Sequence, residues 1–209
     1  MEFPNFSDTL LVRMFHGSIP KPRLFLGKSV ETPTYTNDAR GLVRPNVGGL
    51  LGGHVVVQLR DRVFGFVYID AKKIHWVDQP EFNGEFHNYS VEEWEYIVQH
   101  RRETCFHIPA TEEELMHCES YFLRECRQPS RDYSFWGERC ASNVYRLLVS
   151  LNKIPSGNFR MKAFWPGALR RTLLSEAAKN QWLVSVKEGN TGEWWQGNIS
   201  TFPPHPWHR

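Results

Sequence analysis

Two hydrophobic runs separated by a short polar turn form the clearest strand pattern in the chain. Residues 54–60 (HVVVQLR) and 63–70 (VFGFVYID) are rich in Val, Phe and Tyr, which favour strands. Asp61-Arg62 lies between the runs, so this region predicts a β-hairpin. Because apolar residues fill both runs almost without interruption, we expect a sheet that is covered on both faces.

Shorter hydrophobic segments predict further strands. They lie at residues 9–15 (TLLVRMF), 23–27 (RLFLG) and 181–187 (QWLVSVK). Residues 73–78 (KIHWVD) are compatible with one more strand beside the hairpin. Residues 28–53 contain several Pro and Gly residues and predict a long loop.

Two capping boxes predict where helices begin. Residues 90–93 (SVEE) precede a helix near 91–101, and residues 111–114 (TEEE) precede a helix near 112–126. In each box the hydroxyl accepts a backbone N–H of the first turn, while the Glu side chain accepts the N–H of the cap residue. A further helix is predicted near 167–179.

An amphipathic helix is predicted to begin at Cys140. Its inward face repeats at helical spacing and comprises Cys140, Asn143, Val144, Leu147, Leu148 and Leu151. The cysteine therefore points toward the protein interior in the first turn of the helix. Tyr133 precedes this helix, and we expect it to be a core or rim aromatic rather than part of an oxyanion site.

Length, charge and hydropathy indicate a single globular domain and argue against a nucleic-acid-binding or membrane-spanning protein. The 209 residues suffice for a single domain, with a core expected over 50–187 and an irregular tail over 188–209. Lys plus Arg number 25 and Asp plus Glu number 23, which argues against nucleic acid as the main partner. Residues 1–15 lack a signal-peptide pattern, and no apolar run is long enough to span a membrane. We therefore expect synthesis in the cytoplasm without stable membrane insertion.

The cysteines do not follow a metal-binding pattern. Cys105, Cys118, Cys126 and Cys140 are separated by intervals that match no zinc finger or zinc ribbon. The first three are expected to be small buried hydrophobic residues. We expect no metal and no cofactor.

His54 and Cys140 are the candidate reactive pair. A cysteine at a helix N-terminus is favoured as thiolate, because unpaired N–H groups and the helix dipole point at it. A histidine held at the start of a strand can act as general base and acid. The two residue types together are those required for thiol-dependent hydrolysis.

The segments around this pair resemble a known family. Gly53-His54-Val55-Val56-Val57 is similar to the histidine motif, and the segment CASNV at 140–144 to the cysteine motif, of circularly permuted papain-like hydrolases of the NlpC type. In this permuted branch, which includes lecithin:retinol acyltransferase-like proteins, the histidine strand precedes the cysteine helix, as here. The resemblance implies an α+β fold with a permuted papain-like core, in which a small antiparallel sheet packs on the cysteine helix.

The resemblance also implies a third polar residue that orients the histidine ring. Many members carry this residue twelve positions after the histidine, where this chain has Phe66. Asp70, in the context Ile-Asp-Ala, is the expected substitute. Tyr68, His75 and a dyad without a third member are the alternatives.

The hairpin loop decides whether Asp70 can fill that place. A three-residue loop at 61–63 would set His54 opposite Asp70 on the same sheet face. A two-residue loop at 61–62 would set His54 opposite Ile69 and turn Asp70 to the other face.

The resemblance predicts cleavage of amide bonds in bacterial peptidoglycan peptides. Small size and balanced charge fit an antibacterial effector of a type VI secretion system, with a cognate immunity protein and a target-cell periplasm as its destination. The alternatives are a lecithin:retinol acyltransferase-like lipid acyl hydrolase or transferase, and a non-catalytic binding module on the same fold.

Overall fold

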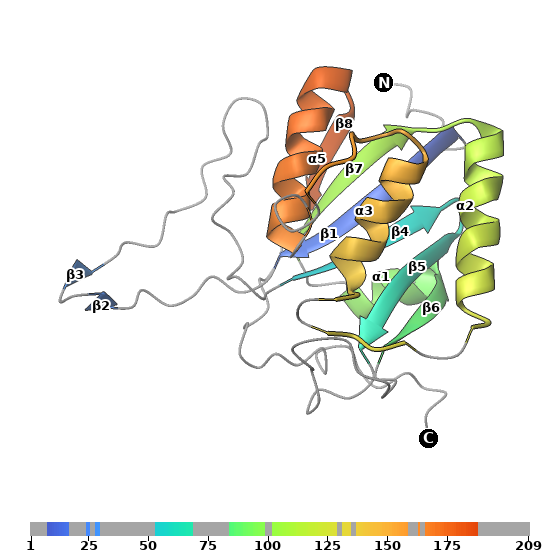
Figure 1. The fold of residues 1–209 in the computed structure, drawn as a ribbon, viewed down its shortest axis with the longest axis horizontal. Helices are drawn as coiled ribbons and strands as arrows, with labels where there is room; N and C mark the ends of the chain where they lie inside the picture. Colours follow the sequence, from blue (N-terminus) through green and yellow to red (C-terminus); the bar gives the residue numbers. More distant parts are fainter. Residues whose placement is uncertain are drawn as a thin grey trace.

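An antiparallel sheet forms the centre of the computed structural model, which describes residues 8–16, 24–25, 28–29, 53–68, 84–98, 102–128, 131–134, 137–158, 163 and 166–187. The sheet has six strands in the order β6-β5-β4-β1-β7-β8 (Figure 1). These strands are β1 (Thr9–His16), β4 (Gly53–Leu59), β5 (Arg62–Tyr68), β6 (Gly84–Ser90), β7 (Glu103–Pro109) and β8 (Leu183–Lys187). A separate pair consists of β2 (Leu24–Phe25) and β3 (Lys28–Ser29).

Helices cover both faces of this sheet (Figure 1). Three lie on one face, namely α2 (Glu112–Glu125), α3 (Cys140–Ser150) and α5 (Pro166–Asn180). Helix α1 (Val91–Val98) lies on the other face. The cysteine helix α3 packs against β4, near the middle of the sheet. The predicted α+β class, with an antiparallel sheet on the cysteine helix, is confirmed.

The predicted helix starts are confirmed by their caps. At the start of α1, the Glu93 N–H donates to Ser90 Oγ at 3.1 Å and the Glu93 carboxylate accepts the Ser90 N–H at 2.8 Å. At the start of α2, Thr111 and Glu114 make the same two bonds at 3.2 and 2.7 Å. Each box satisfies donors that the first helical turn leaves without an intrahelical acceptor.

Two strands were not predicted from the sequence. Strand β6 (GEFHNYS) contains Gly, His and Asn, which have low strand propensity, yet it pairs with β5 from Arg62↔Ser90 to Tyr68↔Gly84. Strand β7 (ETCFHIP) pairs along β1 from Thr9↔Pro109 to Phe15↔Glu103. Pairing with β5 makes β6 extended despite its composition, whereas β7 also contains the strand-favouring residues Thr104, Phe106 and Ile108. The predicted strand at 73–78 lies outside the described residues.

The turn of the β4–β5 hairpin differs from both predicted loops. Arg60 and Asp61 form the turn, and Leu59 pairs with Arg62. Arg60 has a φ of 53°, the left-handed conformation that lets the chain reverse before Asp61. The carboxylates of Glu112 and Glu119 lie beside the Arg60 guanidinium. Neither of the two predicted strand registers is therefore correct. If the observed pairing continued along both strands, residue 67 would lie opposite His54, in place of Asp70 or Ile69.

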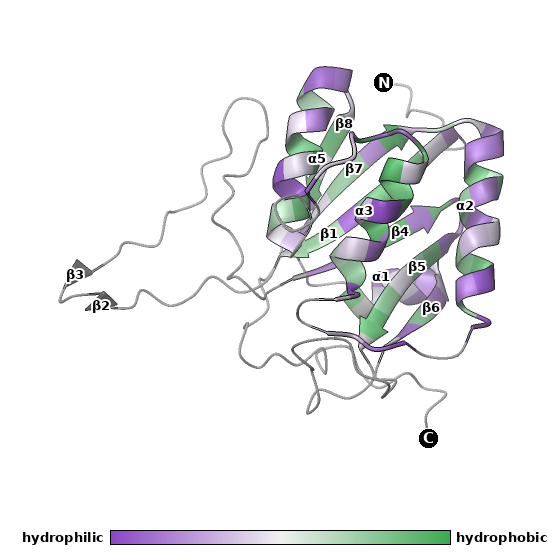
Figure 2. Ribbon diagram, viewed as in Figure 1, coloured by the Kyte–Doolittle hydropathy of each residue, from purple (hydrophilic) through white to green (hydrophobic). Residues whose placement is uncertain are grey.

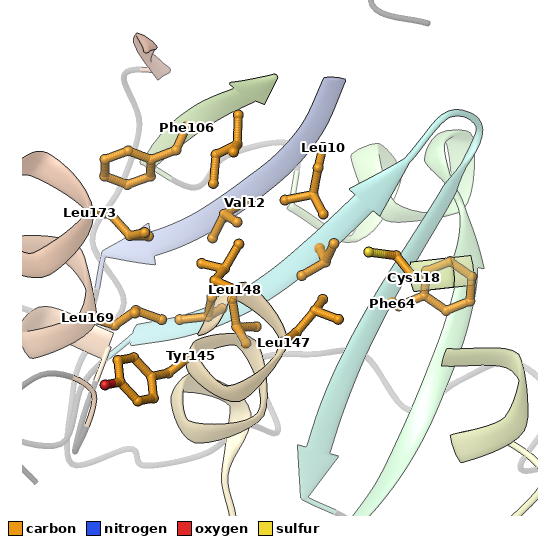
Figure 3. Close-up of a cluster of buried hydrophobic side chains, with 14 of the residues drawn as sticks. Leu10, Val12, Phe64, Phe106, Cys118, Tyr145, Leu147, Leu148, Leu169 and Leu173 are labelled. Atoms are coloured by element: carbon orange, nitrogen blue, oxygen red, sulfur yellow. The ribbon is translucent and has the colours of Figure 1, made fainter. Parts of the chain in front are cut away.

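The two sheet faces carry separate apolar clusters. The larger lies between the sheet and α2, α3 and α5, and Figure 3 shows part of it, including Leu10, Val12, Phe64, Cys118, Leu148 and Leu173. The smaller lies under α1 and comprises Phe15, Val56, Val63, Tyr89, Trp94 and Val98. Hydrophobic residues predominate along β5, whereas α2 and α5 alternate hydrophobic and hydrophilic residues (Figure 2). The sheet is covered on both faces, as predicted.

A buried ionic network crosses the α1 face of the sheet. Arg13 in β1 donates to the Glu103 carboxylate from Nε and also from Nη2, the latter at 2.9 Å. It also donates to Glu95 of α1 and, at 3.0 Å, to Gln58 Oε1 of β4. Arg13 and Glu103 are both buried. The network therefore joins three neighbouring strands and the helix that covers them.

Candidate active site

Cys140 is the first residue of α3, and only 1% of it is exposed. Arg139 precedes it in extended conformation, and its N–H donates to Ser142 Oγ at 2.8 Å. The Arg139 carbonyl accepts the Ser142 hydroxyl at 2.9 Å and the Asn143 side-chain amide at 3.0 Å. These bonds fix the first turn of the helix and hence the position of the thiol.

His54 is the second residue of β4 and approaches from the other face of the sheet. Side chains alternate along a strand, so His54 projects with Val56, which belongs to the cluster under α1. The His54 ring lies 6.5 Å, centroid to centroid, from Trp94 of α1. Cys140, in contrast, belongs to the cluster on the α3 face. The two residues therefore come from opposite sides of the sheet.

His54 and Cys140 meet where strands β4 and β5 are no longer paired with each other. Among the described residues, β4 and β5 pair from Leu59↔Arg62 to Val57↔Phe64 and not beyond. Strand β4 nevertheless stays paired with β1 down to Gly53, and β5 with β6 up to Tyr68. In this region the Cys140 thiol accepts hydrogen bonds from the His54 side chain and from the Val55 backbone N–H. The predicted pair is thus brought together at a split between two strands.

Tyr133 is a third contact of the thiol. Its hydroxyl donates to Cys140 Sγ at 3.4 Å, and its ring stacks on Phe66 at 5.4 Å between centroids. The segment is anchored because Arg131 and Gly84 exchange two backbone hydrogen bonds of 2.7 Å. Tyr133 is a partly buried aromatic packed against the core, as expected, and the contact with the thiol is additional to that role. The loop before α3 carries no sequence pattern that would have revealed it.

The surroundings of Cys140 favour the thiolate. Burial raises the pKa of the thiol, but the charge of His54 and hydrogen bonds from His54 and Tyr133 lower it from 9.0 to about 7. The pKa of Tyr133 is raised, first by burial and then by the negative charge of Cys140, so its hydroxyl remains a proton donor. Cys140 can therefore act as a nucleophile near neutral pH.

The other three cysteines differ from Cys140. Burial raises the pKa of Cys105 and of Cys118 to about 12, and that of Cys126 to about 11. All four cysteines are free thiols. Cys118 is fully buried, as predicted, while Cys105 and Cys126 are partly exposed. Reactivity is therefore concentrated at one of the four.

The predicted orienting residues fall outside the described side chains. Asp70 and His75 lie in a segment that the structure does not describe, and of Tyr68 only the backbone in β5 is described. The prediction that Asp70 orients His54 therefore stays a prediction. The three-residue hairpin loop that would have placed Asp70 opposite His54 is not the loop observed, so the register does not support this prediction.

A polar row on β6 was not foreseen from the sequence. His87 contacts the Glu85 carboxylate through Nε2 and the Tyr89 hydroxyl through Nδ1, the latter at 2.6 Å. His87 lies directly opposite Gly65 of β5, on the side of the sheet that also carries His54. Glu85, His87 and Tyr89 lie at every second position of β6, but Asn88 interrupts the polar–apolar alternation, so the segment carries no clear strand pattern.

The described residues contain neither a cluster of metal-binding side chains nor a helix suited to span a membrane. No group of three or more His, Cys, Asp or Glu side chains there is placed to hold a metal ion. None of the helices in those ranges has both the length and the apolar character needed to cross a membrane.

Comparison with known proteins yields a distant structural likeness. The sequence matches no protein-family model and no curated protein. The fold is similar to the crystal structure of a type VI secretion system effector, TseH, with a TM-score of 0.45 and 12% identity. The alignment covers 87% of this chain and 99% of that chain. A likeness at this level assigns no function to the chain.

Proposed function

We propose that this chain is a cysteine hydrolase in which Cys140 is the nucleophile and His54 the general base. The observation that supports this most strongly is the position of the Cys140 thiol, buried at the start of α3 where the Tyr133 hydroxyl donates to it and His54 contacts it, an arrangement that lowers its pKa. A structural cysteine gains nothing from such an arrangement, whereas a nucleophile requires it. Cys118, equally buried in the same cluster, has its pKa raised instead.

The proposed reaction has two steps. His54 takes the thiol proton, and the Cys140 sulfur attacks an amide carbonyl carbon to form a tetrahedral intermediate. The C–N bond then breaks, the amine leaves with the proton from His54, and a thioester remains on Cys140. In the second step His54 takes a proton from water, and the resulting hydroxide attacks the thioester and releases the acid and the free thiol.

Two groups beside the sulfur suit the developing oxyanion. Backbone N–H groups in the first turn of α3, which begins at Cys140, lack intrahelical acceptors and are suited to this role. The Tyr133 hydroxyl points at the sulfur and keeps its proton at neutral pH, because its pKa is raised. We assign both as hydrogen-bond donors to the tetrahedral intermediate.

The substrate class and the route of delivery come from the family resemblance alone. We propose peptidoglycan peptides as substrate, with the chain acting as an amidase or endopeptidase. Delivery by a type VI secretion system and neutralisation by an immunity protein belong to the same proposal. Asp70 is the proposed orienting residue of His54, with Tyr68, His75 or no third member as alternatives.

Mass spectrometry of purified peptidoglycan after incubation with the protein tests this function. Wild-type protein should release new muropeptide fragments, Cys140→Ala should release none, and Cys118→Ala should match the wild type. Cys118 is the matched control because it is a buried cysteine of the same apolar cluster. Circular dichroism confirms that each variant is folded. Failure of the folded wild type to release fragments contradicts the peptidoglycan assignment, and release by Cys140→Ala contradicts the proposed nucleophile.

A further inference from the structure

Gly65 lies on β5 at the edge of the split between β4 and β5. It is the first residue beyond the last β4–β5 pair, Val57↔Phe64, and it pairs with His87 of β6. Its φ is not in the left-handed region, so its backbone conformation does not require glycine. Glycine inside a strand weakens the strand, since it contributes no side-chain packing. A glycine here therefore needs another physical reason.

The reason is that the surroundings of Gly65 leave little room for a side chain. A methyl group built on Gly65 would lie 2.9 Å from Cγ1 of Val56 and 3.4 Å from Nε2 of His54. The first distance is shorter than real Cβ atoms show, and the second is at the lower limit of ordinary van der Waals contact, so the methyl would fill the space beside the ring completely. Any side chain at this position would thus meet the imidazole and its neighbour on β4.

The backbone cannot easily move to make room. Strand β5 is held by pairing with β6 on both sides of Gly65, from Arg62↔Ser90 to Tyr68↔Gly84. Strand β4 is held by pairing with β1, where His54 lies opposite Phe15. The Val56 side chain or the new methyl would therefore have to shift, and a methyl displaced from Val56 toward the ring would press on the imidazole and change its contact with the thiol.

We propose that Gly65 is a positioning residue, whose missing side chain leaves the space in which the His54 imidazole contacts Cys140. The proposal rests on the proposed function, because it concerns the geometry of the same catalytic pair. Gly65 touches neither the sulfur nor the substrate, and it acts through His54. Gly65→Ala should therefore impair the pair while the sheet remains intact.

The test measures the thiol without any substrate. The rate of Cys140 alkylation by iodoacetamide is followed against pH by mass spectrometry of the Cys140 peptide. The midpoint should lie near 7 in the wild type and about one unit or more higher in Gly65→Ala. In the His54→Ala background the added methyl should shift the midpoint no further, since the imidazole through which it acts is gone.

The same substitution in a Val56→Ala protein provides a control in case Gly65→Ala alone does not fold. Val56→Ala removes the 2.9 Å contact, while the methyl of Gly65→Ala still faces His54 Nε2. In this background Gly65→Ala should raise the midpoint by less than it does in the wild-type background, because the methyl then meets only the ring, at 3.4 Å. An unchanged midpoint in Gly65→Ala, or an equal shift with and without His54, would overturn the proposal. A wild-type midpoint at 9 or above would instead contradict the proposed function and this inference together, which separates the two failures.

Discussion

Two buried polar assemblies lie on adjacent strands and have opposite chemical character. On β1, Arg13 is bound by the carboxylates of Glu103 and Glu95. Burial lowers the pKa of Arg13, but its bonds with these carboxylates outweigh this and raise it above its ordinary value, so it stays charged. On β4, His54 meets a thiol whose pKa is about 7. The first assembly has a fixed charge state, whereas the second changes its charge state near neutral pH.

The difference in charge state indicates that the Arg13 network contributes to stability, whereas the His54–Cys140 pair is suited to reactivity. Removing one partner of a buried ion pair leaves an uncompensated buried charge, which is strongly destabilising. A cysteine of lowered pKa is instead a common feature of a reactive site. We therefore expect substitutions in the Arg13 network to change the free energy of unfolding, and substitutions around Cys140 to change the rate of reaction.

The largest expected effect is the loss of activity in Cys140→Ala. None of the other three cysteines can replace the sulfur as nucleophile near neutral pH, because their pKa values are raised to about 11 or 12. Hydrolysis should fall at least about a thousandfold. At pH 7 the free energy of unfolding, measured with urea, should change by less than in the Arg13 network. Residual activity close to wild type would place the chemistry elsewhere.

Breaking the ionic network should have the next largest effect, and on stability alone. Glu103→Gln leaves the Arg13 guanidinium buried with one carboxylate fewer and should lower the free energy of unfolding by about 3 kcal/mol. Urea unfolding measures the loss. The alkylation midpoint of Cys140 in the folded variant should equal that of the wild type. If the midpoint moved with stability, the two assemblies would not be separate.

A smaller effect is expected from Tyr133→Phe. The variant keeps the ring that stacks on Phe66 and removes only the hydroxyl that donates to the thiol. Loss of one hydrogen bond to a charged group should reduce the hydrolysis rate by roughly tenfold and raise the thiol pKa slightly. Steady-state kinetics and the alkylation profile check both effects. An unchanged rate would reduce Tyr133 to a packing residue.

The smallest effect is a difference in how stability depends on pH. The pKa of the Cys140 thiol is about 7 in the folded chain and near 9.0 when unperturbed, so the folded state loses this proton more readily. Its contribution is fully present above pH 9 and is lost as the pH falls through 7. Thermal midpoints of wild type and Cys140→Ala should therefore diverge from pH 6 to pH 9. The offset caused by Glu103→Gln should stay constant over that range.

Much of the fold could be predicted where local pattern and tertiary packing agree. The capping boxes at Ser90 and Thr111 and the apolar face beginning at Cys140 each satisfy a local requirement that the final structure also uses. Strand β7 has the strand-favouring residues Thr104, Phe106 and Ile108 at alternating positions, so its sequence does carry a strand pattern. Strand β6 mixes such residues with Gly and Asn and is extended through its pairing with β5. Local composition does not encode that pairing.

The candidate site could be predicted in its residue types but not in its geometry. A histidine before a strand and a cysteine before a helix indicated His54 and Cys140. Their approach from opposite faces depends on the split between β4 and β5, which no local pattern encodes. The hairpin register also escaped prediction, since Arg60 adopts a left-handed conformation one position before the expected turn.

The pH dependence of Cys140 alkylation in wild type and in His54→Ala tests the central claim most directly. The account predicts a midpoint near 7 in the wild type. In His54→Ala the midpoint should rise to 9 or above, because burial then acts without the charge and hydrogen bond of the imidazole. Identical profiles for the two proteins would contradict the claim that His54 and Cys140 form a reactive pair.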